Sequence, residues 1–173
     1  VFDSKLETAV PRGNGPDLFI SAQGNLGKWT SMGLIAPVEG PLGAHRDPAV
    51  QALTRDGTTW GRPLAFKSVL LLYDPTVAET PPATTDALLA AIEAHETPER
   101  YGIAYEVAAP FYHAGWMHGF GGSAMDGSGA ATLDTPGQVA ALRFAARLAG
   151  HMPPQPTAQK VGQLAAEGRA VFI

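Results

Sequence analysis

Residues 134–173 decide the expected fold, and they read DTPGQVAALRFAARLAGHMPPQPTAQKVGQLAAEGRAVFI. The segment Asp134–Pro136 is a strong helix-start signal, and Gly150 and Pro153 mark the stop. Between them, apolar residues recur at steps of three and four, which predicts one apolar stripe along the helix: Val139, Leu142, Ala146 and Ala149. A second short helix is predicted over Thr157–Ala166.

Gly168 then leads into an apolar strand, Ala170–Ile173. Working outward, the same alternation of helix and strand continues through the rest of the chain. Helices are predicted over 2–10, 25–33, 47–53, 84–95 and 110–118, and strands over 17–20, 58–60, 68–73 and 101–106. This alternation favours an α/β layered fold in which mixed, mostly parallel sheets are flanked by helices.

Composition excludes several classes of protein. The chain has 173 residues, a net charge of −4 and no cysteine, and 45% of its residues are apolar. The length suits one ordinary domain, and the apolar content is too high for a disordered chain. No basic cluster is present for nucleic acid, and no apolar run is long enough to span a membrane. The absence of cysteine excludes disulfide scaffolds and thiolate metal sites.

Short segments spread over nearly the whole chain carry a more specific signal. They lie at Gly15–Phe19, Leu26–Pro37, Gly57–Ala65, Leu71–Asp74, Pro81–Thr85 and Ala165–Phe172. The first has the form G-x-P-D-hydrophobic, and the last resembles A-F-x-x-G-K-A-A-M. Their order and spacing resemble the extracellular solute-binding proteins of carbohydrate ABC importers, the maltose-binding-protein-like group with the periplasmic-binding-protein fold.

The resemblance implies a two-lobed architecture of which this chain is an internal portion, because members of that group are generally about twice as long. The first lobe's part is expected over residues 1–66 and the second lobe's part over 67–173, with the crossing near Phe66–Ser68. The usual first strand would precede Val1, and the return segments would follow Ile173. The implied function is non-catalytic binding of a solute, a carbohydrate in this group, at the periplasmic or extracellular face of a bacterial membrane, for delivery to ABC permease subunits.

The resemblance also implies ligand-binding positions, because the group binds sugar in a cleft between lobes. Aromatic rings stack on the apolar face of a pyranose, and polar side chains hydrogen-bond its hydroxyls. The matching positions lie in three places. The loop after the first predicted strand holds Ser21, Gln23 and Asn25, the crossing holds Lys67, and the start of a second-lobe helix holds Phe111 and Tyr112.

Three positions depart from the group's pattern. Ser21 stands where an aromatic residue is expected, Ala109 where an acid is expected, and Lys67 where maltose-type members often carry an acid. The solute is therefore left open between a maltodextrin, another sugar, an acidic sugar and a different compound. No cofactor, metal or nucleic-acid partner is expected. Attachment to a membrane is expected only through a partner or an anchor.

Two other hypotheses about the function stay open. The small residues Ser21, Gly24 and Ala109 suit a sensory or scaffold module, fused to a permease or receptor, that has a degenerate pocket. Scattered Ser and His residues suit a hydrolase-like enzyme, but none lies in a G-x-S-x-G context. His113 and His118 lack the i, i+4 spacing of a helical zinc pair, so no metal site is predicted.

Overall fold

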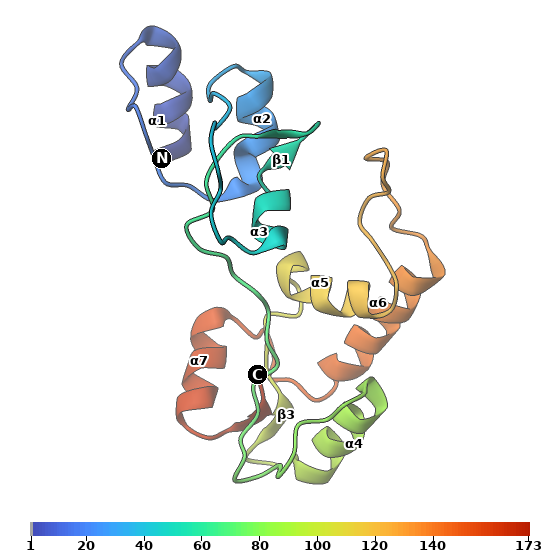
Figure 1. Ribbon diagram of the computed structural model, residues 1–173. Helices are drawn as coiled ribbons and strands as arrows, with labels where there is room; N and C mark the ends of the chain where they lie inside the picture. Colours follow the sequence, from blue (N-terminus) through green and yellow to red (C-terminus); the bar gives the residue numbers. More distant parts are fainter. Residues whose placement is uncertain (1) are drawn as a thin grey trace. The chain divides into compact units, whose positions relative to one another are not determined.

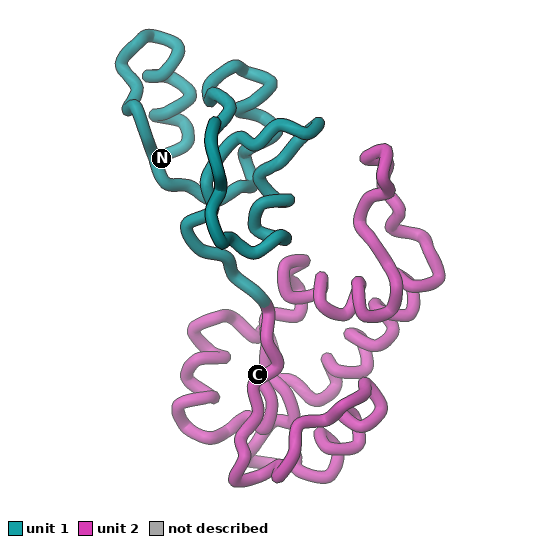
Figure 2. Tube along the Cα trace, in the orientation of Figure 1, with its two compact units in different colours: residues 1–68 teal, residues 69–173 magenta. Residues whose placement is uncertain are grey.

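The computed structural model describes residues 2–173. The chain divides into two compact units, Val1–Ser68 and Val69–Ile173, which Figures 1 and 2 show. Along the chain, the boundary between the units falls after Ser68, close to the crossing predicted near Phe66–Ser68, and the assignment of each part to a lobe stays a prediction. Within residues 2–173, no helix has the length and apolar character needed to cross a membrane.

Unit 1 is built from short elements. They are α1 (Phe2–Ala9), η1 (Val10–Arg12), η2 (Gln23–Asn25), α2 (Leu26–Ser31), α3 (Asp47–Gln51), β1 (Thr54–Arg55) and β2 (Thr58–Thr59). The two strands form an antiparallel hairpin. Its turn residues Asp56 and Gly57 both have positive φ, 51° and 74°, as the two central residues of a type I′ turn require.

The core of unit 1 is a small cluster between α1 and α2. Leu6, Trp29 and Leu34 are each less than 10% exposed. Phe19 packs on this cluster with its ring edge-on to Trp29, at 5.4 Å between centroids. Trp29 is thus a core residue of unit 1.

The strand predicted over 17–20 is wrong. Leu18 is 90% exposed and Ile20 76% exposed, and the structure assigns no strand here. Among the described residues no strand pairs with this segment. An extended apolar run forms a strand only where a neighbouring strand accepts and donates the backbone hydrogen bonds. Without such a neighbour, only Phe19 of this run packs on the core of unit 1.

Unit 2 carries the longer helices. Its elements are α4 (Thr85–His95), β3 (Tyr101–Ile103), α5 (Pro110–Gly119), α6 (Pro136–Ala149), α7 (Ala158–Ala166) and β4 (Ala170–Phe172). All four helices agree with the predicted ones. Three begin after a threonine whose hydroxyl accepts a hydrogen bond from a backbone N–H of the first turn: Thr84, Thr135 and Thr157.

The sheet of unit 2 has β4 at its centre. β3 pairs with β4 in parallel, with Tyr101 opposite Ala170 and Ile103 opposite Phe172. On the other edge of β4, Leu72 and Ile173 exchange two antiparallel backbone hydrogen bonds of 2.8 and 2.9 Å. The strand predicted over 68–73 therefore contributes one short pairing, because only its last residues lie beside β4. The strand predicted over 101–106 ends at Ile103.

The main core lies where helices cover this sheet. The largest side chains that are almost fully buried are Ile92, Ile103, Leu148, Leu164, Val171 and Phe172. Every residue of β4 is buried, as expected for a strand that has neighbours on both edges and is covered on both faces.

The face that α6 buries differs from the predicted stripe. Its buried residues are Gln138, Ala141, Phe144, Ala145 and Leu148. Val139 and Leu142, which the stripe contained, are 39% and 52% exposed. The helix therefore has two apolar sides, and the periodic pattern selected the side that faces solvent.

Candidate functional site

The predicted ligand contacts fall into two groups, one in each unit. Ser21, Gln23, Asn25 and Lys67 belong to unit 1, and Phe111 and Tyr112 belong to unit 2. Ser21, Gln23 and Asn25 lie within five residues of one another, and the rings of Phe111 and Tyr112 are in contact, whereas Lys67 lies near the boundary of unit 1.

In unit 1, the polar positions lie on the loop and the 3-10 turn that precede α2. Ser21 and Gln23 are exposed, and their side chains are open to solvent. Asn25 is half-buried, and its amide Nδ2 donates a hydrogen bond of 2.9 Å to Asp3 Oδ2 on α1. Asn25 thus has a structural partner, while Ser21 and Gln23 remain the two positions of this group that face solvent.

A carboxylate on α1 fixes the helix that follows this loop. Glu7 Oε1 accepts a hydrogen bond of 2.6 Å from Lys28 Nζ and one of 3.1 Å from Trp29 Nε1. These bonds to Lys28 and Trp29 favour the charged carboxylate and lower the pKa of Glu7. α2, and with it the polar loop, is therefore held against α1 by a charged contact.

Replacing Glu7 by glutamine is expected to remove a pH-dependent part of this stabilisation. Because the folded-state pKa of Glu7 is lowered, its contribution is present above the unfolded-state pKa and is lost as the pH falls through the folded-state value. Wild-type unit 1 should lose protection against amide hydrogen exchange in α2 between neutral pH and pH values below the ordinary glutamate pKa. E7Q should lose less over that range. An equal loss in both proteins would contradict the role given to Glu7.

Lys67 lies near the end of unit 1 and is exposed. It forms no ion pair with another residue in the described part of the chain. Its role at a solute site stays a prediction.

In unit 2, α5 begins close to the carboxyl end of β3. The chain leaves β3 at Ile103, makes a turn in which the Ala109 N–H donates to the Glu106 carbonyl at 2.9 Å, and enters the helix at Pro110. Proline is pre-shaped for a first helical position. In α/β proteins, solutes bind outside the carboxyl ends of parallel strands, so this turn is where a ligand contact is expected.

The two predicted aromatic residues of α5 differ in burial. Phe111 is 56% exposed, whereas Tyr112 is half-buried and packs against the main core. Their rings meet edge to face, with 5.3 Å between centroids. Tyr112 therefore packs against Phe111, of which more than half stays exposed.

A second aromatic cluster joins α5 to α6 and to the segment that follows β3. Trp116 Nε1 donates a hydrogen bond of 3.2 Å to the Tyr105 hydroxyl, and the Trp116 ring packs edge-on to Phe144 at 4.9 Å. Burial raises the pKa of Tyr105, so the hydroxyl that accepts this bond is neutral at physiological pH. Trp116 is thus a packing residue, and it holds the helix that carries Phe111.

One further polar residue of this region was not among the predicted ligand contacts. Glu106 is half-buried in the turn between β3 and α5. A polar residue between a strand and a helix is a signal for a ligand contact. Glu106 did not show this signal because the predicted strand, 101–106, included it, whereas β3 ends at Ile103. No group of three or more metal-ligating side chains occurs within residues 2–173.

Known proteins share this architecture. The cyclo/maltodextrin-binding protein complexed with maltotetraose superposes with a TM-score of 0.85 at 25% identity, over 98% of this chain and 47% of that one. The Thermus thermophilus maltotriose-binding protein bound with maltotriose gives a TM-score of 0.76 at 23% identity, over 98% and 50%. The fold is therefore that of a periplasmic binding protein, as the resemblance implied.

Sequence comparison defines the family. The profile of the bacterial extracellular solute-binding proteins matches residues 3–173. The maltotriose-binding protein of Pyrococcus abyssi (strain GE5 / Orsay) is 31% identical over 150 residues, which is 82% of this chain and 33% of that protein. The chain belongs to the bacterial extracellular solute-binding protein family. It spans about a third of that relative and about half of the solved structures.

Proposed function

We propose that this chain is a portion of the sugar-binding component of an ABC importer, and that the protein binds and delivers its solute without catalysis. The observation that carries the proposal is the open ring of Phe111, held by Tyr112 at the start of α5. An exposed aromatic face on a rigid helix suits the apolar face of a pyranose. The three relatives named above support this proposal, since each is named for binding malto-oligosaccharides.

The polar positions supply the rest of the proposed recognition. Ser21 and Gln23 offer neutral donors and acceptors to hydroxyls, and Lys67 offers a cation that favours an electron-rich or anionic oxygen. Glu106, in the turn before α5, is a further proposed acceptor for hydroxyl groups. The proposed location is the periplasmic or extracellular face of a bacterial cell membrane, with ABC permease subunits as partners.

The proposal is tested by thermal unfolding of the complete gene product in the presence of single sugars. The panel contains maltose, maltotriose, maltotetraose, glucose and galacturonate. A ligand present at 100 times its dissociation constant adds about 2.7 kcal/mol to the free energy of unfolding. The melting temperature is therefore expected to rise by several degrees with at least one sugar.

A matched pair of variants identifies the binding residue. Phe111→Ala is expected to reduce the shift in melting temperature, because the stacking surface is removed. Leu133→Ala serves as the control, since Leu133 is 58% exposed against 56% for Phe111 and lies outside the α5 turn. A folded protein that responds to no sugar would reject the proposal and favour the sensory or scaffold alternative. An undiminished response in F111A would reject the assigned stacking residue.

A further inference from the structure

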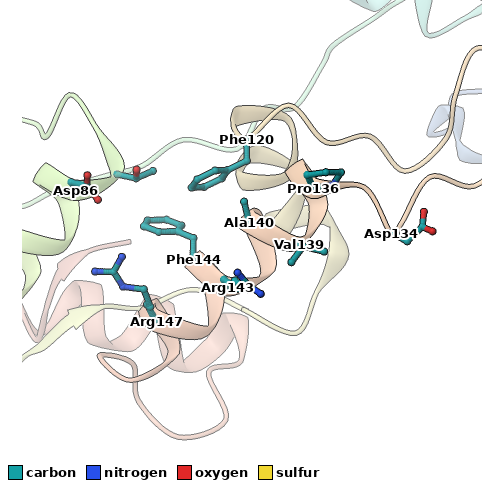
Figure 3. A pocket seen from close by; sticks show the side chains of 10 residues that line it. Asp86, Phe120, Asp134, Pro136, Val139, Ala140, Arg143, Phe144 and Arg147 are labelled. Atoms are coloured by element: carbon teal, nitrogen blue, oxygen red, sulfur yellow. The ribbon is translucent and has the colours of Figure 1, made fainter.

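A groove of about 540 Å³ runs along one side of α6, within unit 2 (Figure 3). Its floor is apolar and is formed by Phe120, Ala140 and Phe144. The Phe120 and Phe144 rings lie 5.5 Å apart and tilt toward each other. The volume lies within the range of ordinary ligand and peptide pockets.

Two arginines of α6 line this groove. Arg143 and Arg147 are four residues apart, so they lie one above the other on the same side of the helix. Both are exposed, and neither forms an ion pair with any residue between 2 and 173. α6 contains no acidic residue, although the whole chain carries a net charge of −4.

The carboxylates near the groove leave these cations available. Asp86 comes from the first turn of α4, and Asp134 from the residues just before α6. Neither lies within ion-pair distance of a guanidinium group. The negative charges of Asp86 and Asp134 disfavour a bound molecule that is acidic on all sides. Carboxylates of a bound molecule are therefore expected only on the side that faces Arg143 and Arg147.

Apolar surface continues beyond the groove. Val139, which lines the groove, is 39% exposed; Leu142, three residues further along α6, is 52% exposed, and Leu133, three residues before the helix, is 58% exposed. These residues make up the exposed apolar side of α6 together with the loop that precedes it. Exposed apolar side chains beside aromatic and arginine residues are typical of protein interfaces.

We propose that this groove is a docking surface for an acidic segment of a partner protein that inserts an aromatic or aliphatic side chain between Phe120 and the arginines. The anchor packs on the Phe120–Phe144 floor. Two carboxylates of the segment, spaced to match one helical turn, accept hydrogen bonds from Arg143 and Arg147. This surface is separate from the sugar-contact residues, so the inference does not depend on the proposed function.

The test is a selection from a random peptide display library on the complete gene product, followed by anisotropy titration of the enriched peptides. We expect enriched sequences to combine Asp or Glu with an aromatic or large aliphatic residue. Their affinity should fall at least about tenfold for R143E/R147E and for R143Q/R147Q, and binding should weaken as salt concentration rises. Peptides with Glu replaced by Gln should lose affinity to a similar degree.

The control variant K5E/R12E changes the net charge by the same amount as R143E/R147E but lies in unit 1. It should bind the selected peptides like the wild type. Circular dichroism verifies that all three variants are folded. The proposal is overturned if no acidic–apolar sequence is enriched, or if the selected peptides bind R143E/R147E and the wild type equally. Displacement of the peptides by micromolar phenyl phosphate would assign the groove to a small aromatic anion instead and would also overturn it.

Discussion

Phe172→Ala is expected to lower the free energy of unfolding of unit 2 by about 3–5 kcal/mol. Phe172 is fully buried at the end of β4 and is the largest of the fully buried side chains. Its backbone pairs with β3 on one edge and with Tyr73 on the other, so the neighbouring strands cannot move in to fill the space. The cost is therefore the lost apolar burial plus a cavity.

Urea unfolding followed by circular dichroism measures this effect. Leu142→Ala is the control, because Leu142 is 52% exposed on α6, and its truncation should change the free energy by less than about 0.5 kcal/mol. Equal losses in F172A and L142A would show that β4 is not the centre of the core.

Gly137→Ala is expected to destabilise unit 2 by about 1–3 kcal/mol. Gly137 lies in the first turn of α6, where an added Cβ would be 2.6 Å from the Phe120 carbonyl oxygen and 2.8 Å from the Gly122 nitrogen. Both atoms belong to the backbone, so they cannot rotate away as a side chain does. The substitution must separate α6 from the turn that follows α5.

Gly162→Ala is the matched substitution and should have the opposite sign. Gly162 is exposed in the middle of α7, and nothing lies within 4 Å of the Cβ that alanine would add. Alanine is preferred to glycine in a helix by about 0.5–1 kcal/mol. If both variants shift the urea midpoint in the same direction, the close approach at Gly137 does not govern the packing of α6.

Helices could be predicted well from this sequence because their signals are local. Thr84, Thr135 and Thr157 cap their helices through their own hydroxyls, and Pro110 and Pro136 occupy first helical positions. These contacts lie within a few residues, so a sequence pattern contains them.

Strands and buried faces could not be predicted as well, because they depend on distant partners. The runs at 17–20 and 68–73 have similar apolar content, but only the second has residues beside β4. α6 has apolar residues on two sides, and periodicity alone does not say which side meets the core. Phe144 and Leu148, which the predicted stripe omitted, lie on the buried side.

The candidate site was reached through the family resemblance more than through the residues themselves. The sequence predicted that Phe111 lies at the start of a helix. The structure adds that Phe111 is 56% exposed, whereas Tyr112 packs against the main core. The partner of Asn25 on α1 and the place of Glu106 in the turn before α5 required coordinates.

Isothermal titration calorimetry of the complete gene product with maltotriose and the other panel sugars tests the central claim most directly. Binding of at least one sugar at a single site per protein, with a dissociation constant raised about tenfold or more by F111A and unchanged by L133A, is the result that sugar recognition at α5 predicts. The absence of binding heat for every sugar, in a protein that unfolds cooperatively, would contradict it.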